Sequence, residues 1–203
     1  VEGILDGVIE EEEQIHYLTT ISRQTERLNK LVEELDVLTL NAQPRIESDG
    51  EAEIVFLDQL LIEVMSEFQL LIEQEERDIY IQVSPESAKI KSHYDKLSRI
   101  LVNLLNNAFK YSDPGTKIEV VAQLTEQILT ISVKDEGQGI APEDLDKIFK
   151  RLYRVETSRN MKTGGHGLGL AIARELAHQL GGEITVESQC GLGSTFTFAL
   201  NLT

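Results

Sequence analysis

The chain has 203 residues, with 19 Lys and Arg against 35 Asp and Glu, which gives a formal net charge of −16. Because an acidic surface repels phosphate, we expect no nucleic-acid partner held by phosphate contacts. Apolar residues make up 41% of the chain, enough for one sizeable core. That core is expected to be aliphatic, since Trp is absent and aromatic residues reach only 5%.

The first part of the chain is acidic and has helical periodicity. Apolar residues recur at three- and four-residue spacing from Ile15 to Leu38, which predicts a helix over residues 13–41. Apolar residues before the acidic run Glu10–Glu13 indicate the end of an earlier helix, so together they predict a truncated helical hairpin. The alternative is a solvated acidic tail. Since the first residue is Val rather than Met, we expect the protein to continue upstream.

A second domain is predicted beyond a break in this pattern. Pro44 and Gly50 stop any helix, so we predict domains at residues 1–43 and 52–203, joined by a linker at 44–51. Strands are expected at 54–57, 79–83, 89–92, 117–124, 127–135, 183–188 and 194–202, and helices at 58–74, 94–111, 142–148 and 168–180. Strands that occur in pairs with helices between them favour an α+β sandwich over a doubly wound parallel sheet.

Three glycine clusters follow or open these elements, at residues 135–140, 164–169 and 191–195. Glycine lets the backbone approach a ligand closely, and the second cluster runs into the start of a predicted helix, where free amides favour an anion. A single cluster of this kind is typical of an ordinary turn. The Walker pattern and the dinucleotide glycine spacing are both absent, which disfavours the two commonest nucleotide-binding folds.

A basic segment precedes the second glycine cluster. Between residues 147 and 162, six cations occur with one acid, Glu156: Lys147, Lys150, Arg151, Arg154, Arg159 and Lys162. In so acidic a chain, this segment is predicted to close over bound phosphates. The alternative is a solvated basic face.

Two amide side chains suggest a metal site. Asn103 and Asn107 lie four residues apart and share one face of the predicted helix 94–111. Their oxygens can bind a hard cation such as Mg²⁺, with phosphate oxygens and water completing its coordination, and Lys110 adds a charge nearby. Read alone, two Asn in a helix are more often caps or surface residues.

Asp135 ends a predicted strand where the chain turns at Gly137. A carboxylate at the floor of an apolar pocket can accept a hydrogen bond from an exocyclic amine, which selects adenine over guanine. Thr195 is predicted to support it through a water. The alternative is a plain turn-capping Asp.

Taken in order, these motifs resemble the N, G1, F, G2 and G3 boxes of bacterial sensor histidine kinases. The matching residues are Asn103, Asn107, Ala108, Lys110 and Tyr111; Asp135, Gly137, Gly139 and Ile140; Ile148, Phe149, Tyr153 and Arg154; Gly165, Gly167, Leu168 and Gly169; and Gly191, Gly193, Ser194, Thr195 and Phe196. The resemblance implies a catalytic ATP-binding domain at 52–203, with the fold of gyrase, MutL and heat-shock chaperones: a mixed β-sheet on helices.

The resemblance also implies a role for each position. Asn103 and Asn107 would hold Mg²⁺, and Arg154 is the candidate for stabilising the transferring γ-phosphoryl group. The implied catalytic residues are Arg154, Asn103 and Lys110. The implied ATP contacts are Asn103, Asn107, Lys110, Tyr111, Asp135, Gly137, Gly139, Ile140, Arg154, Arg159, Gly165, His166, Gly167, Leu168, Gly169 and Thr195. His166 stands where the family more usually has a small hydroxyl residue.

One family feature is missing. These kinases first phosphorylate a His followed closely by an acid, Arg and Thr-Pro, and His16 has neither an adjacent acid nor a following Pro. We therefore expect the chain to use Mg-ATP to phosphorylate a His upstream of Val1, for relay to an Asp of a response regulator. The resemblance implies a homodimer and the cytoplasmic domain of a membrane protein whose membrane segments lie outside these residues.

Two other functions stay open at this point. ATPases of the gyrase, MutL or chaperone kind usually carry a water-activating Glu where this chain has Asn103, so hydrolysis by this chain should be slow. Rapid multiple-turnover hydrolysis would favour this alternative. A non-catalytic nucleotide sensor or anti-sigma-like module predicts binding without phosphotransfer.

Overall fold

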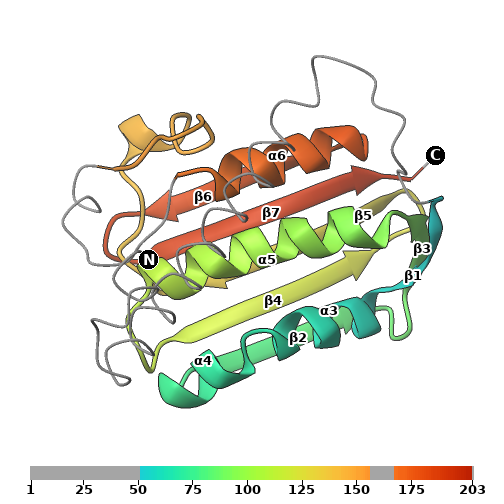
Figure 1. The fold of residues 1–203 in the computed structure, drawn as a ribbon, viewed down its shortest axis with the longest axis horizontal. Helices are drawn as coiled ribbons and strands as arrows, with labels where there is room; N and C mark the ends of the chain where they lie inside the picture. Colours follow the sequence, from blue (N-terminus) through green and yellow to red (C-terminus); the bar gives the residue numbers. More distant parts are fainter. Residues whose placement is uncertain (1–50, 156–166, 203) are drawn as a thin grey trace, which may run out of the picture. The chain divides into compact units, whose positions relative to one another are not determined.

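A computed structural model describes residues 51–155 and 167–202 (Figure 1). The hairpin predicted at 1–43 and nearly all of the linker predicted at 44–51 lie outside this part of the chain. Within the described ranges, no helix is both long enough and apolar enough to cross a bilayer.

The order of elements follows the predicted order closely. It is β1 (Glu53–Phe56), α3 (Leu57–Ser66), α4 (Gln69–Gln74), β2 (Asp78–Ser84), β3 (Lys89–Ser92), α5 (Tyr94–Tyr111), β4 (Lys117–Leu124), β5 (Ile128–Asp135), the 3-10 turn η2 (Pro142–Asp144), α6 (Gly169–Gln179), β6 (Gly182–Gln189) and β7 (Gly193–Asn201). Each predicted strand is present, with ends within one residue of those expected.

The main sheet has the strand order β2-β4-β5-β7-β6. β2 runs parallel to β4, and the other neighbouring pairs are antiparallel, so the sheet is mixed. A separate two-stranded antiparallel sheet joins β1 to β3. The predicted α+β fold with a mixed sheet is confirmed.

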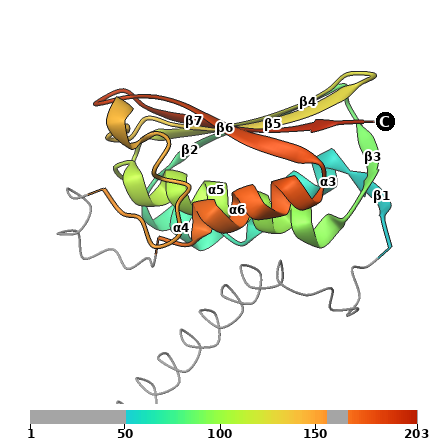
Figure 2. The same cartoon turned by 90° about the horizontal axis from the view of Figure 1, so that it is seen from above.

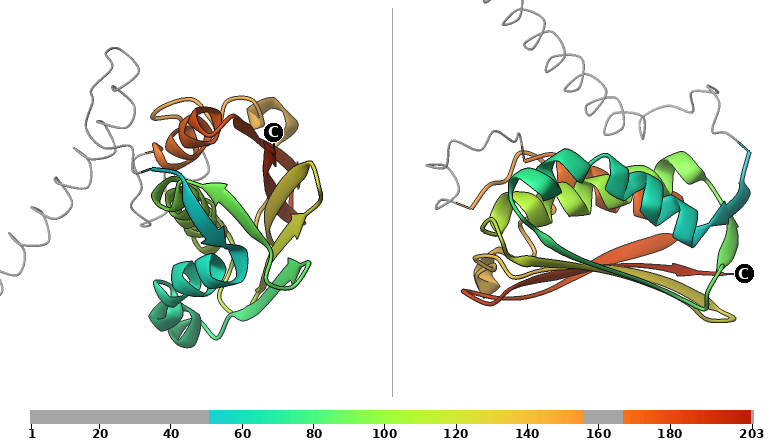
Figure 3. Two further views of the ribbon diagram at one scale, coloured as in Figure 1. Left: turned by 90° about the vertical axis from the view of Figure 1, so that its right-hand side faces the viewer. Right: turned by 90° about the horizontal axis from the view of Figure 1, so that it is seen from below.

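The helices α3, α5 and α6 cover one face of this sheet, which makes two layers (Figures 2 and 3). Alternate strand residues point toward the helices and are buried, as the two-residue period of a strand requires. These include Ile118, Val120, Leu129, Ile131, Val133, Phe196 and Phe198. In α5, Leu97, Ile100, Leu101, Leu104 and Leu105 are buried as well. The core is mainly aliphatic, and each such side chain contributes roughly 1.5–3 kcal/mol by burial.

Two predicted helices differ from the observed ones. The helix expected at 58–74 is interrupted at Glu67 and Phe68, which separate α3 from α4. Phe68 is buried, whereas none of the α4 residues is. The helix expected at 142–148 is wrong: only Pro142–Asp144 form a short 3-10 turn. The chain then continues through further turns that bury Ile148 and Phe149.

Candidate nucleotide-binding site

Asp135 closes β5 with a carboxylate that is almost completely buried, at 3% exposure. The backbone amide of Gly137 donates to its Oδ1 at 2.8 Å, and the backbone amide of Ser194 donates as well. Burial raises the pKa of this carboxyl and outweighs the two amide hydrogen bonds, which lower it. The side chain is therefore a fixed acceptor in a poorly solvated position. The bond from Gly137 is also the turn cap named as the alternative, and the adenine contact stays a prediction.

The strand register decides which neighbour stands beside Asp135. Ser194 of β7 is paired with Asp135, and Thr195 is paired with Lys134. Residues paired across an antiparallel ladder share a face, so the side chain of Thr195 lies on the opposite face from Asp135. Ser194 is 7% exposed and takes the position that the sequence analysis assigned to Thr195. That assignment is corrected by one residue.

The first glycine cluster has no room for side chains. A β-carbon on Gly137 would lie 2.2 Å from the carbonyl oxygen of Tyr111. At Gly139, φ is +70°, and a β-carbon would lie 2.0 Å from the carbonyl oxygen of Gln189. Only glycine leaves room for the neighbouring carbonyl groups at these two positions. Close packing therefore restricts the sequence of this loop, in addition to the positive φ of its turn.

Backbone hydrogen bonds tie the same loop to both sides of the site. The backbone amide of Gln138 donates to the carbonyl oxygen of Tyr111, at the end of α5, at 3.0 Å. The carbonyl of Gln138 accepts from the amide of Gly191 at 2.8 Å, in the turn between β6 and β7. The first and third glycine clusters and the Lys110-Tyr111 end of α5 are thereby brought together.

Ser188 is a site neighbour that the sequence analysis missed. Its hydroxyl accepts a hydrogen bond from the Ile140 backbone amide at 2.8 Å and donates one to the Gly193 carbonyl at 2.8 Å. The Ser194 hydroxyl lies 3.0 Å from it. A lone Ser inside a strand has no local signal for such a role. Only the pairing of β6 with β7 shows it.

The predicted metal ligands lie on α5 beside the start of α6. The side-chain amide of Asn103 donates to the Arg99 carbonyl at 2.8 Å, which leaves its oxygen as an acceptor. A β-carbon on Gly169 would lie 2.8 Å from that oxygen, so the two helices approach closely at this point. Asn107 is half-buried on the same helix. The structure thus brings the amide motif to the N-terminus of α6, where free backbone amides favour an anion.

Lys110 and Tyr111 occupy the last turn of α5. The Lys110 ammonium lies 5.0 Å from the centre of the Tyr111 ring, a cation–π distance. Both side chains are half-buried. They remain predicted contacts to phosphate or ribose.

The second glycine cluster is only partly described. Gly167 accepts a hydrogen bond from the Leu152 amide at 2.9 Å, and Leu168 is buried. This bond joins Leu152 of the basic segment to the chain just before α6. Arg159, Gly165 and His166 lie outside the described residues.

The described part of the basic segment is held by side-chain contacts. Tyr153 donates to Asp144 Oδ1 at 2.6 Å, and Lys147 forms an ion pair with the same oxygen at 3.2 Å. The Tyr153 hydrogen bond, followed by that from Lys147, lowers the pKa of the Asp144 carboxyl. Lys147 therefore has a carboxylate partner just before the basic segment. Arg154, the residue after Tyr153, is half-buried.

No cluster of three or more His, Cys, Asp and Glu suited to a metal ion occurs within residues 51–155 and 167–202. The predicted magnesium ligands are amides, and phosphate oxygens and water would have to supply the other positions. A metal held in this way depends on the nucleotide being bound.

Residues 92–203 match the family described as histidine kinase-, DNA gyrase B-, and HSP90-like ATPases. The chain belongs to this family. The match runs from the end of β3 to the C-terminus and so contains all five motifs. The resemblance drawn from their order is confirmed.

The curated relatives include histidine protein kinases. The chain is 38% identical to histidine protein kinase SaeS of Staphylococcus epidermidis over 203 residues, which cover 98% of this chain and 56% of the relative. It is 37% identical to histidine protein kinase SaeS of Staphylococcus aureus over 204 residues, covering 98% and 57%. The chain spans about half the length of these relatives.

Solved structures share the fold. Histidine kinase AdeS of Acinetobacter baumannii is 26% identical with a TM-score of 0.76, and the match covers 100% of this chain and 91% of that one. Full-length ShkA in complex with AMPPNP is 27% identical with a TM-score of 0.80, covering 94% and 39%. The two-layer arrangement is therefore that of histidine kinase catalytic domains.

Proposed function

We propose that this chain is the ATP-binding catalytic part of a sensor histidine kinase. It binds Mg-ATP and transfers the γ-phosphoryl group to a His outside these 203 residues, for relay to an Asp of a response regulator. The whole protein acts as a homodimer, with this domain on the cytoplasmic side of a membrane. Family membership and the kinases among the relatives support the proposal.

The observation that carries it is the Asp135 carboxylate. It is buried, and two backbone amides hold it in one orientation. An ionised carboxylate can accept more hydrogen bonds than these two, so a purine with an exocyclic amine is preferred over one with a carbonyl at that position. This arrangement favours adenine over guanine.

The residues beside the triphosphate favour transfer over hydrolysis. Asn103 has an amide in place of a carboxylate, so it cannot take a proton from water as a general base. Lys110 and Arg154 add positive charge for the transferring group, and the nucleophile comes from another domain. Bound Mg²⁺, held by Asn103 and Asn107, would neutralise phosphate charge. Catalysis then rests mainly on positioning.

The first test is the replacement Asp135→Asn. We expect the affinity for an ATP analogue with Mg²⁺ to fall by on the order of 100-fold, because the amide can no longer offer two acceptor oxygens. Titration calorimetry measures this, with the exposed carboxylate of Asp78 as the matched control in Asp78→Asn. An affinity unchanged in Asp135→Asn refutes the adenine contact.

The second test concerns the metal. Asn107→Asp places a charge where the proposal puts a neutral ligand, so the Mg²⁺ concentration needed for half-maximal nucleotide binding should change by about tenfold. The measurement is a nucleotide titration over a range of Mg²⁺ concentrations. If the metal dependence matches that of the unchanged chain, Asn107 is not a ligand.

Phosphotransfer in trans separates the three candidate functions. When a hairpin domain that carries a phosphoacceptor His is added, the proposal predicts ATP-dependent labelling of that His. Rapid multiple-turnover hydrolysis without an acceptor would instead favour an ATPase of the gyrase, MutL or chaperone kind. Nucleotide binding without labelling would favour a sensor module.

A further inference from the structure

We infer that Arg77 is a positioning residue for the nucleotide site, acting through the C-terminal end of α5. The inference rests on the proposed function for the identity of the ligand. Arg77 directly precedes β2, upstream of the residues 92–203 that match the family, and none of the site motifs includes it.

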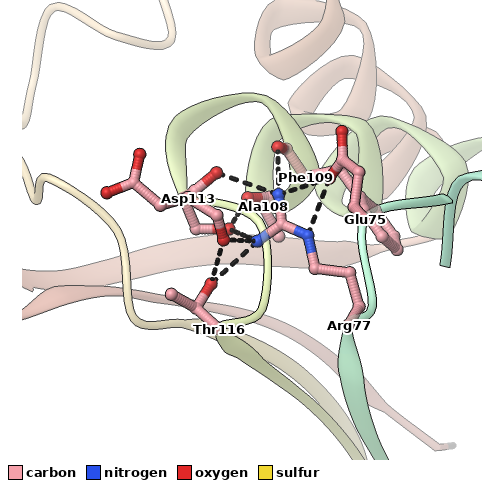
Figure 4. Close-up of polar contacts among 7 residues, drawn as sticks. Glu75, Arg77, Ala108, Phe109, Asp113 and Thr116 are labelled. Carbon is pink, nitrogen blue, oxygen red and sulfur yellow. Dashed lines mark hydrogen bonds and ion pairs between the residues drawn. The ribbon is translucent and has the colours of Figure 1, made fainter.

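The Arg77 side chain is buried at 1% exposure beside a single carboxylate (Figure 4). Its Nε and Nη2 both contact Glu75 Oε2, at 2.8 and 2.7 Å. Its guanidinium carbon lies 5.5 Å from the centre of the Phe109 ring, which itself stacks on Phe68. The charge is thus paired on one side and covered by an aromatic ring on the other.

The other donors of Arg77 reach the end of α5 and the following turn (Figure 4). Nη2 donates to the carbonyls of Phe109 at 3.0 Å and Ser112 at 2.9 Å. Nη1 donates to the hydroxyls of Ser112 at 2.8 Å and Thr116 at 2.7 Å, and to the carbonyl of Asp113. The last carbonyls of a helix have no partners within the helix, and a guanidinium can satisfy several of them at once.

These contacts lie on either side of two residues that are predicted to bind the nucleotide. Lys110 and Tyr111 lie between Phe109 and Ser112, whose carbonyls Arg77 holds. The Tyr111 carbonyl in turn accepts the amide of Gln138, in the loop that begins at Asp135. A shift of the α5 end would therefore move this loop as well.

A second connection passes through β4. Arg77 holds Thr116, which directly precedes β4, and Ile118 of β4 is paired with Asp135. The two routes reach the same carboxylate from the helix and from the strand. Arg77 thus fixes the relative position of Tyr111 and Asp135, which lie on separate elements.

Stability alone does not require such a group. Burying a guanidinium has a large desolvation cost, and apolar residues of similar volume can replace buried ion pairs without loss of stability. The planar guanidinium group of an arginine has five N–H donors in fixed directions, which suits a site where several carbonyls must be held in one geometry. A lysine ammonium cannot reproduce that arrangement of donors. The effect of losing Arg77 is therefore expected in ligand affinity.

The experiment compares Arg77→Lys with Ile100→Val, which changes a core residue of α5 away from the C-terminal end of that helix. Affinity for an ATP analogue with Mg²⁺ is measured by calorimetry, and amide hydrogen exchange of Gln138 by NMR without nucleotide. We expect Arg77→Lys to weaken affinity about tenfold and to accelerate Gln138 exchange about tenfold. The Ile140 amide, which Ser188 holds, should keep its rate, and Ile100→Val should change neither affinity nor the ratio of the two exchange rates.

Wild-type affinity and unchanged Gln138 exchange in folded Arg77→Lys would overturn the inference. If that variant does not fold, Ser112→Ala and Thr116→Val each remove one acceptor and should weaken affinity two- to threefold, about 0.4–0.7 kcal/mol. Wild-type affinity in both would overturn it equally. If the unchanged chain binds no adenine nucleotide, the proposed function fails. Gln138 exchange then decides the positioning role by itself.

Discussion

The end of the sheet at Asp135 and the basic segment at residues 147–155 both carry predicted nucleotide contacts, but they are held in different ways. Around Asp135 the backbone itself sets the geometry, through amides donated to the carboxylate and a glycine with no room for a side chain. In the basic segment, the contacts of Tyr153 and Lys147 with Asp144 join side chains that are partly exposed.

This difference matches the two tasks proposed for the regions. Distinguishing adenine from guanine needs an acceptor fixed within a few tenths of an ångström, which a backbone framework provides. Phosphates carry diffuse charge and accept hydrogen bonds from many directions, so partly exposed side chains suffice for them. Disturbing the first region should have large effects, and disturbing the second should have small ones.

The largest effect is expected from Gly139→Ala. Its new methyl group would collide with the Gln189 carbonyl, so the free energy of unfolding should fall by about 3 kcal/mol or more, with loss of nucleotide binding. Gly191→Ala is the matched control: φ there is +78°, close to the +70° of Gly139, but no atom lies within 4 Å of the added carbon. That control should lose only about 1 kcal/mol. Equal losses in chemical denaturation would show that backbone conformation, and not close packing, matters here.

A smaller effect concerns the pH dependence of stability. Because burial raises the pKa of Asp135, the folded state holds its proton more tightly than the unfolded state. Stability should therefore fall as pH rises from the ordinary aspartate value of 3.8 through the raised folded value. Asp135→Asn removes this component, so the variant should gain stability relative to the unchanged chain across that window. Denaturation curves at several pH values measure it, and parallel pH profiles would contradict it.

The smallest effect is expected from Tyr153→Phe. Loss of its hydroxyl should raise the pKa of Asp144 toward the ordinary value, as measured by NMR of the carboxyl carbon. The stabilisation from ionised Asp144, present above its unfolded pKa and lost as pH falls through its folded pKa, should shrink. Nucleotide affinity should change by less than about threefold. A loss of nucleotide affinity as large as that expected for Asp135→Asn would mean that both regions are held equally rigidly, which would contradict the difference drawn between them.

Local pattern was enough for most elements of the fold. The ends of α5 and β4 agree with the predicted ends, because a helical stripe or a regular alternation of apolar residues runs over their full length. The predicted helix at 142–148 was wrong because consecutive turns bury Ile148 and Phe149. Turns do not produce a regular spacing of apolar residues that would distinguish them from a short helix.

The site divides in the same way. The close backbone approach at Gly137 and Gly139 could be predicted, because it requires glycine and glycine is visible in the sequence. Thr195 was placed on the wrong face, since a shift of one residue along a strand exchanges the two faces and only the pairing with β5 settles it.

The sequence by itself therefore determined the family, the order of the strands along the chain and the motifs proposed to surround the nucleotide, because each depends on neighbours within a few residues. Only the tertiary structure decided that Ser194 stands beside Asp135, that Ser188 joins two loops and that Arg77 holds the end of α5. Ser194 and Asp135 lie 59 positions apart in the sequence, Ser188 contacts residues 5 to 48 positions away, and Arg77 reaches 32 to 39 positions along the chain. Partners at such separations are chosen by packing and strand register, which leave no local trace.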